Sequence, residues 1–182
     1  MLAAVRELLA EGTTPTVEQA ADRAGISRTT AYRYFANQRE LLLACYPKLD
    51  ATTLLDADAP ADPVARLDLV TAEIARQLLD HEPELRAMLR LSLESPKPDR
   101  DALPLRQGRA IRWIEDALAP LKKRIRKPAL HRLVLAIRAA IGIEPLVWLT
   151  DIAGLSREDA ITLMRDSART LLRAALVESQ PE

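Results

Sequence analysis

The sequence has little cysteine, little glycine and few aromatic residues, and each scarcity narrows what the chain can be. Its one cysteine, Cys45, excludes an internal disulfide and argues against a cysteine-based zinc site. Aromatic residues make up only 3% of the 182 positions, and glycine occurs five times against twelve prolines. Leucine, alanine, isoleucine and valine must therefore fill the core, which 48% hydrophobic residues make sizeable. This composition favours helices over sheets and predicts an all-α fold.

Long apolar runs and an excess of one charge are also missing. No apolar run approaches the roughly 20 residues needed to span a bilayer, and the first residues lack the basic-then-apolar pattern of a secretory signal. We therefore expect a soluble, cytoplasmic protein with no membrane partner. The formal net charge is zero, and residues 1–48 carry six Lys or Arg against five Asp or Glu. Bulk charge thus gives no indication of a nucleic-acid partner.

The sequence also lacks the residue spacings that mark catalytic and metal sites. His81 and His131 are isolated, and neither forms a metal-binding spacing such as His-Glu-x-x-His. There is no glycine-rich phosphate loop and no nucleophile elbow. Cys45 continues the apolar face of a helix that starts after residue 37, so core packing explains it better than a reactive thiol does. We expect no enzymatic activity, no cofactor and no metal ion.

What the sequence does contain is a helix-turn-helix pattern in residues 16–35. Gly25 can supply the positive φ that closes one helix, Ile26 can fill the angle between two helices, and Ser27 can cap the next helix. The side chains after the cap form hydrogen bonds and include no carboxylate; they are Arg28, Thr29, Thr30, Tyr32, Arg33 and Tyr34. This set suits a groove lined with phosphates, so residues 27–35 are predicted to read DNA.

Flanking signals extend this pattern to a three-helix head over residues 1–48. Thr16 with Gln19, and Asn37 with Glu40, have the spacing of capping boxes and mark two helix starts. The helix at 16–24 carries small apolar residues at helical spacing, which permit a close helix crossing. The first helix supplies the third wall with Leu2, Val5, Leu8 and Leu9.

Residues 16–41 resemble the tetracycline-repressor (TetR) family of bacterial one-component regulators. The match includes the aromatic cluster Tyr32-x-Tyr34-Phe35 followed by Asn37-x-x-Glu40-Leu41, which separates this family from most helix-turn-helix proteins. The resemblance implies double-stranded DNA as partner, with the first positions of helix 27–35 at base edges and other residues at phosphates. The predicted DNA-binding set is Thr16, Ser27, Arg28, Thr29, Thr30, Tyr32, Arg33, Tyr34 and Gln38. Family members usually carry further, often basic, residues ahead of the first helix, so either this start is truncated or misassigned, or affinity comes without such an arm.

Residues 49–182 are predicted to form a helical effector-binding and dimerisation domain. Apolar stripes mark helices at 63–79, 82–93, 105–125, 130–149 and 157–176. Pro120 should kink the third of these, and Gly142 and Pro145 should break or bend the fourth. Two of them, around 130–141 and 157–176, carry apolar residues on two sides, which predicts a second subunit as the further partner. The resemblance also implies a four-helix bundle between two subunits. The candidate dimer residues are Leu130, Val134, Ile141, Ile161, Met164, Ala168, Leu171 and Ala175.

Large, soft side chains in this second part could line a pocket for a small molecule, although core packing explains each of them at least as well. The candidate ligand-binding residues are Ile74, Leu78, Met88, Leu89, Trp113, Ile114, Ile137 and Trp148. Aliphatic lining predicts an apolar effector, oriented by a polar group from Arg109, Glu144 or Asp151. The basic cluster at 122–127 could be mistaken for a nucleic-acid patch, but positive charge that complements a helix C-terminus is the stronger interpretation.

Three functions are compatible with these patterns. The first is a ligand-responsive transcriptional regulator, a repressor released from a palindromic operator by a small apolar effector. The second is a helical interaction protein that keeps the helix-turn-helix but has lost DNA binding. The third, a helical enzyme, is disfavoured because no acid–base, nucleophile or metal constellation is present. We favour the first.

Overall fold

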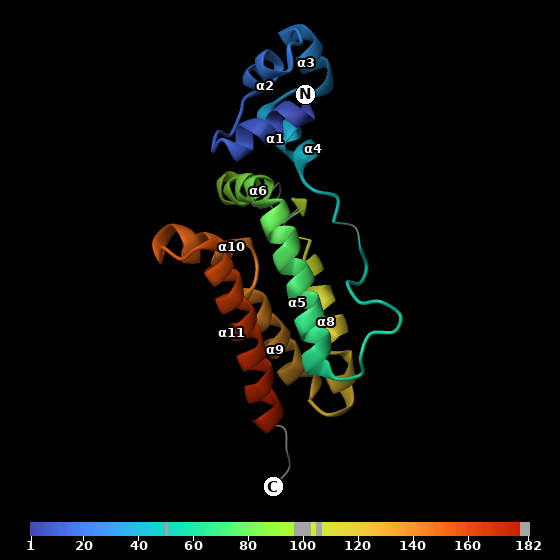
Figure 1. Ribbon diagram of the computed structural model, residues 1–182. Helices are drawn as coiled ribbons and strands as arrows, with labels where there is room; N and C mark the ends of the chain where they lie inside the picture. The colour runs from blue at the N-terminus through green and yellow to red at the C-terminus, as the bar shows by residue number, and fades with distance from the viewer. Residues whose placement is uncertain (50, 97–102, 105–106, 179–182) are drawn as a thin grey trace. The chain divides into compact units, whose positions relative to one another are not determined.

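A computed structural model describes residues 1–49, 51–96, 103–104 and 107–178 of the chain. All regular elements among these residues are helices, so the predicted all-α class is confirmed (Figure 1). The chain divides into two compact units. One consists of Met1–Leu49 with His81–Gln107, and the other of Asp50–Asp80 with Gly108–Glu182.

The first unit is the predicted helical head together with one helix from later in the sequence. Its helices are α1 (Leu2–Ala10), α2 (Val17–Ala24), α3 (Arg28–Tyr34), α4 (Gln38–Cys45) and α6 (Glu82–Glu94). Helix α1 packs on α2, α4 and α6, while α3 packs on α2 and α4 packs on α6. Their buried residues form one cluster: Val5, Leu9, Val17, Ala20, Ala21, Ala31, Leu41, Leu42, Cys45 and Ala87.

Polar contacts add to this packing of α6 against the head. The nearly buried carboxylate of Glu84 lies 3.6 Å from Nε of Arg6 on α1, and Nη1 of Arg90 donates a 2.8 Å hydrogen bond to Oγ1 of Thr14. The compact unit therefore extends past the predicted division at 48/49 and takes in residues 81–107. The assignment of DNA binding to 1–48 and of effector binding to 49–182 stays a prediction.

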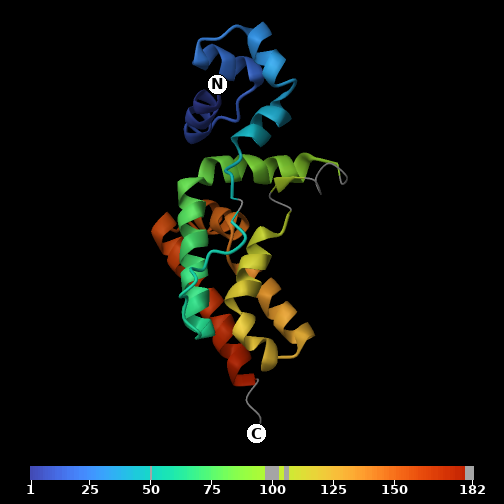
Figure 2. The same cartoon turned by 90° about the vertical axis from the view of Figure 1, so that its right-hand side faces the viewer.

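The second unit is built from long helices that lie side by side (Figure 2). Its elements are α5 (Pro63–Asp80), α8 (Arg109–Ala117), the 3₁₀-helix η2 (Ala119–Lys123), α9 (Lys127–Ala140), α10 (Ile143–Val147), the π-helical turn η3 (Trp148–Ile152) and α11 (Arg157–Glu178). Helix α11 packs on α9 and α5, and α8 packs on the same two helices. The guanidinium of Arg169 on α11 donates to the carboxylate of Asp68 on α5 at 3.0 and 3.2 Å, which adds a polar link to the packing of α11 on α5.

Two predicted long helices are interrupted in the structure. The helix predicted over 105–125 is α8 followed by η2, because Pro120 cannot donate to the α-helical ladder; positions 105 and 106 lie outside the described residues. The helix predicted over 130–149 breaks at Gly142, whose φ is 148°. There Nη1 of Arg138 donates to the carbonyl of Ile141 at 3.0 Å, and its guanidinium pairs with Glu144 at 3.1 Å.

The segment Lys127–Ile152 bears on the membrane expectation. By length and composition this segment is long and apolar enough to cross a membrane. The prediction that the sequence contains no apolar run of about 20 residues is therefore wrong by this measure. A core helix of a soluble protein passes the same test. In the structure the segment is divided among α9, α10 and η3, with a break at Gly142.

Cys45 is buried in the head, as expected for a packing residue. Its thiol is 1% exposed, and burial raises its pKa to about 11. Only the thiolate reacts readily with disulfide reagents.

We predict that folding suppresses the reaction of Cys45 with 5,5′-dithiobis(2-nitrobenzoic acid) at pH 8. The usual thiol pKa is near 8.5, so the thiolate fraction should fall roughly two hundredfold on folding. Absorbance of the released thionitrobenzoate checks this, with guanidinium-unfolded protein as control. Equal rates for folded and unfolded protein would contradict the burial of α4 against α1.

Candidate nucleic-acid interface

The turn between α2 and α3 has the backbone that the sequence predicted. Gly25 adopts φ 66° and ψ 29°, a left-handed conformation that a residue with a side chain rarely adopts. The following amide, of Ile26, donates to the carbonyl of Ala21 at 3.1 Å and closes the end of α2. At the other end of α2, Thr16 and Gln19 form the predicted reciprocal capping box.

Helix α3 presents one polar face and packs with the other. The amide of Thr30 donates to Oγ of Ser27 at 3.2 Å, which caps the helix as expected. Ala31 is fully buried. Four exposed side chains lie on one side of the helix, at spacings of one, three and one residues: Arg28, Thr29, Tyr32 and Arg33. This face can lie in a groove while Ala31 keeps the helix attached to the head.

The charge on this face is positive and largely uncompensated. The side chain of Arg28 is 68% exposed, and its nearest carboxylate, that of Asp22, is 3.9 Å away. Arg33 forms no ion pair within the described part of the chain, and α3 itself contains no acidic residue. A phosphate or a guanine edge therefore meets Arg33 without a competing ion pair among the described residues, and Arg28 with one long ion pair to Asp22.

Tyr32 has a partner that the sequence did not reveal. Its hydroxyl donates a short hydrogen bond to the carboxylate of Glu18, fourteen residues earlier in α2. This bond raises the pKa of the Tyr32 phenol and lowers the pKa of the Glu18 carboxyl. At neutral pH the phenol is thus protonated and Glu18 ionised. The Tyr32 hydroxyl must leave Glu18 before it can donate to a base acceptor, although its oxygen can accept from a base amino group while the bond to Glu18 remains.

Two of the expected phosphate ligands are engaged within the head. Nε2 of Gln38 donates to the carbonyls of Pro15 and Thr14 at 3.0 and 3.3 Å, which holds the start of α4 against the turn before α2. Oγ1 of Thr16 accepts from the amide of Gln19 at 3.2 Å. Tyr34, in contrast, is among the most exposed apolar side chains of the head. The roles of these residues at phosphates stay predictions.

A further positioning contact was missed because no local spacing signals it. Both terminal nitrogens of Arg23 donate to the two carboxylate oxygens of Glu11 at 2.8 and 2.9 Å. This bidentate pair joins α2 to the end of α1, and it raises the pKa of Arg23 while it lowers that of Glu11.

The eight candidate ligand-binding residues are divided between the two units. Met88 and Leu89 lie on α6 in the first unit, whereas the other six belong to the second. Most of these six are core residues: Ile74, Leu78, Trp113, Ile114 and Ile137 are buried, and the Trp113 indole donates to the carbonyl of Ala51 at 2.8 Å. Trp148 is 54% exposed. Two hollows described in the second unit are lined by other residues.

The candidate dimer residues are mostly packed inside a single subunit. Leu130, Val134, Ile141, Met164 and Ala168 are all buried in the isolated chain. Ile161, Leu171 and Ala175 are half-buried. The apolar surface of the first five already contacts the subunit's own helices, and their place in a dimer interface stays a prediction. The exposed side chains of α9 and α11 include Leu135, Ala139, Leu163, Thr170, Ala174 and Val177.

Comparison with known proteins agrees with this geometry for the head. A comparison with curated proteins gives no match. Residues 1–45, which contain α1 to α4, match the family described as "Bacterial regulatory proteins, tetR family". The match covers the head alone, and with the exposed basic face of α3 it indicates a DNA-binding transcriptional regulator whose head is similar to that of the tetR family.

Proposed function

We propose that this protein is a cytoplasmic repressor that binds a palindromic operator as a homodimer and leaves it when a small apolar effector binds. The observation that carries the proposal is the face of α3. It is exposed, it has two arginines and no carboxylate, and the left-handed turn at Gly25 holds it away from the core. Side chains of this kind fit the major groove, where arginine can bond guanine O6 and N7 together.

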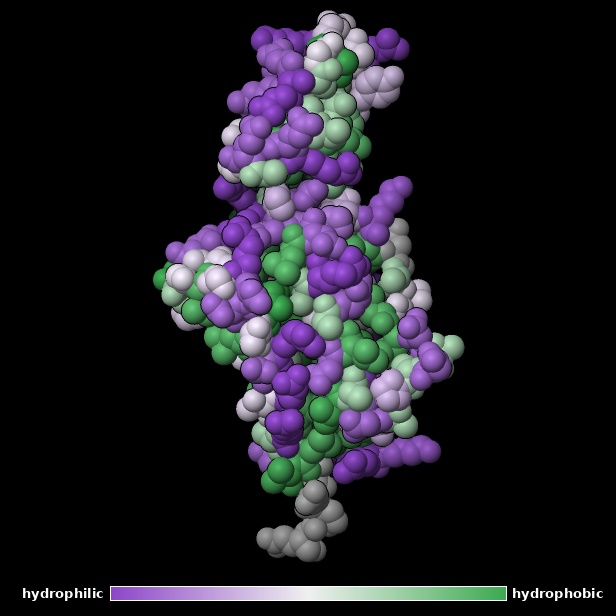
Figure 3. All heavy atoms as spheres, viewed as in Figure 1, coloured by the Kyte–Doolittle hydropathy of each residue, from purple (hydrophilic) through white to green (hydrophobic). Residues whose placement is uncertain are grey.

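Dimerisation is supported by the apolar faces that α9 and α11 leave uncovered. On α11, Leu163, Thr170, Ala174 and Val177 lie within one sector of the helix and are exposed. On α9, Leu135 is exposed in the same way. Figure 3 shows apolar surface in the second unit near α10 and at the lower end of α11. Two such faces related by a two-fold axis would form a four-helix contact and set two α3 helices about 34–36 Å apart.

Control by an effector is supported by the way α6 belongs to the head. Helix α5 of the second unit ends at Asp80, and α6 begins at Glu82, so a single residue joins them. Helix α6 packs on α1 and on α4. A ligand that displaces α5 from its neighbours would act on α6 through this short link, and α6 would then shift α4 and the reading helix. Glu144 is one of the polar residues expected to orient the effector. An effector bound there would compete with Arg138, which already pairs with Glu144.

We expect Arg28→Ala to weaken operator binding by about 1–3 kcal/mol and to relax the base preference at one position. Duplexes that the wild-type protein selects from a randomised pool, varied one base pair at a time, measure both effects. Lys48→Ala is the control, since Lys48 is exposed in the same unit but lies outside α3. It should leave the preference for each base unchanged. If Arg28→Ala gave the same relative affinities across all variant duplexes as wild type, α3 would not read bases through this residue.

The dimer proposal predicts different effects for two leucines of equal exposure. Leu163 on α11 and Leu69 on α5 are 47% and 49% exposed. Leu163→Arg should place an unpaired charge in the interface and give the mass of one chain, 20.2 kDa, in light scattering at micromolar concentration. Leu69→Arg should leave a mass twice as large. A wild-type protein that is monomeric at this concentration, or a dimer that survives Leu163→Arg, would refute this interface.

Effector control predicts that some compounds stabilise the free protein and release its DNA. A compound library screened by thermal shift, with and without operator DNA, identifies the candidates, and each is then tested for its effect on operator affinity. A shift from 1:99 to 99:1 between binding and non-binding arrangements requires about 5.5 kcal/mol of differential affinity. Compounds that stabilise the protein yet leave operator affinity unchanged would show that the pocket is not coupled to α3.

A further inference from the structure

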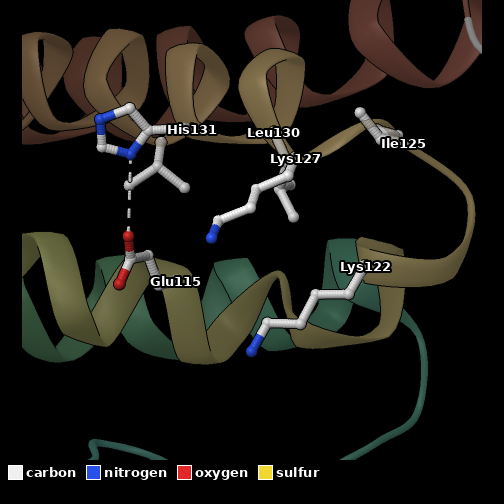
Figure 4. A pocket seen from close by; sticks show the side chains of 7 residues that line it. Glu115, Lys122, Ile125, Lys127, Leu130 and His131 are labelled. Atoms are coloured by element: carbon white, nitrogen blue, oxygen red, sulfur yellow. Dashed lines mark ion pairs between the residues drawn. The ribbon is translucent and has the colours of Figure 1, made fainter.

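The second unit contains a pocket that none of the predicted effector residues lines. It has a volume of about 410 Å³, within the range of small-molecule sites. Helix α8, the 3₁₀-helix η2 and the first half of α9 form its walls. The residues that line it are Glu115, Lys122, Ile125, Lys127, Leu130, His131 and Val134. Figure 4 shows the Lys127 side chain extending from α9 into the space between α8 and α9, while the Lys122 side chain extends from η2 along α8.

The floor of the pocket is apolar. Val134 is fully buried and Leu130 nearly so, while Ile125 is half-buried in the turn before α9. Ile125 therefore offers most of the accessible aliphatic surface of these three, and Leu130 and Val134 close the floor beneath it. An apolar group placed here would lose contact with water on the side that faces them, which favours binding in proportion to the area covered.

The rim of the pocket carries more positive than negative charge. Lys122 and Lys127 form no ion pair among the described residues. The one carboxylate in the lining, that of Glu115, lies 3.9 Å from Nδ1 of His131 (Figure 4). An anion that enters between Lys122 and Lys127 therefore meets two cations without displacing an existing partner.

This positive charge is not explained by the end of a helix, as the sequence suggested for all of residues 122–127. Helix α8 already ends at Ala117, and only the short η2 ends near Lys123. Lys127 is the first residue of α9, where the helix dipole disfavours a positive charge. The segment places five cations within six positions, Lys122, Lys123, Arg124, Arg126 and Lys127, and none has a carboxylate partner within the described ranges.

We infer that this pocket binds a small organic anion with an aliphatic body. The carboxylate or sulfonate group of the ligand lies between the ammonium groups of Lys122 and Lys127, and its apolar body lies on Ile125, Leu130 and Val134. Binding requires neither DNA nor a second subunit, so the site goes beyond the proposed function. Failure of operator binding and failure of this site are therefore measured separately.

The test uses the full-length protein without DNA and follows its histidine ring signals by NMR. The chain contains two histidines, His131 in the pocket wall and His81 in the other unit, and His81→Gln assigns the two signals. Octanoate should shift the His131 signals saturably and leave His81 unchanged. 1-Octanol, which lacks the charge, and acetate, which lacks the chain, should each bind at least about tenfold more weakly. Acetate or octanol that binds as tightly as octanoate would overturn the proposal.

Paired variants test the role of the two lysines. Lys122→Gln with Lys127→Gln should weaken octanoate at least about tenfold. The matched control, Lys48→Gln with Lys123→Gln, removes the same charge from exposed residues outside the pocket and should change affinity less than about twofold. If both pairs of substitutions weakened octanoate binding equally, the general positive charge of the surface and not this pocket would account for binding, and the proposal would be wrong. A non-operator duplex that shifts His131 as octanoate does would assign the segment to nucleic acid instead. The wild-type ligand series decides the matter if a variant fails to fold.

Discussion

The position of α3 depends on the close packing of small residues behind it. Ala20, Ala21 and Ala31 are fully buried where α2 and α3 meet, so the two helix backbones approach closely. The turn between the two helices requires the left-handed backbone of Gly25, whose φ of 66° is one that residues with a side chain rarely adopt. A larger residue at Ala31 would push α3 outward and change the direction in which Arg28 and Arg33 project. The direction of the exposed polar face of α3 is thus set by packing on the opposite face of the helix.

Local sequence signals sufficed for the head, whereas long-range packing did not follow from them. Helix caps and the Gly25 turn depend on residues within five positions of one another, so Thr16, Ser27, Asn37 and Gly25 could all be identified from spacing. The bond between Tyr32 and Glu18 spans fourteen positions, and no pattern marks it. The inclusion of α6 in the head is harder still, because it depends on contacts between segments about eighty residues apart, such as Arg90 with Thr14.

The dimer residues show a different limit of sequence reasoning. A helix with two apolar stripes must cover both, but the spacing does not say which stripe faces its own subunit. On α11 the stripe with Met164 and Ala168 proved to be the inner one, and Leu163 belongs to the outer sector. Periodicity therefore predicted that α9 and α11 have two apolar sides and could not assign a partner to either. Only the observed packing of α11 on α9 and α5 distinguishes them.

The internal bonds of the head affect how α3 can discriminate between DNA sequences. Arg28 and Arg33 meet DNA with few bonds to break, so their attraction to phosphate and guanine is available at once. To donate to a base, the Tyr32 hydroxyl must first break its hydrogen bond to Glu18, and the free Glu18 carboxylate then lies near the negatively charged DNA. Contact with a correctly placed base acceptor is needed to offset both costs. If α3 lies in the major groove as proposed, Tyr32 would contribute more to the difference between operator and unrelated DNA than to binding itself, whereas the arginines would support both.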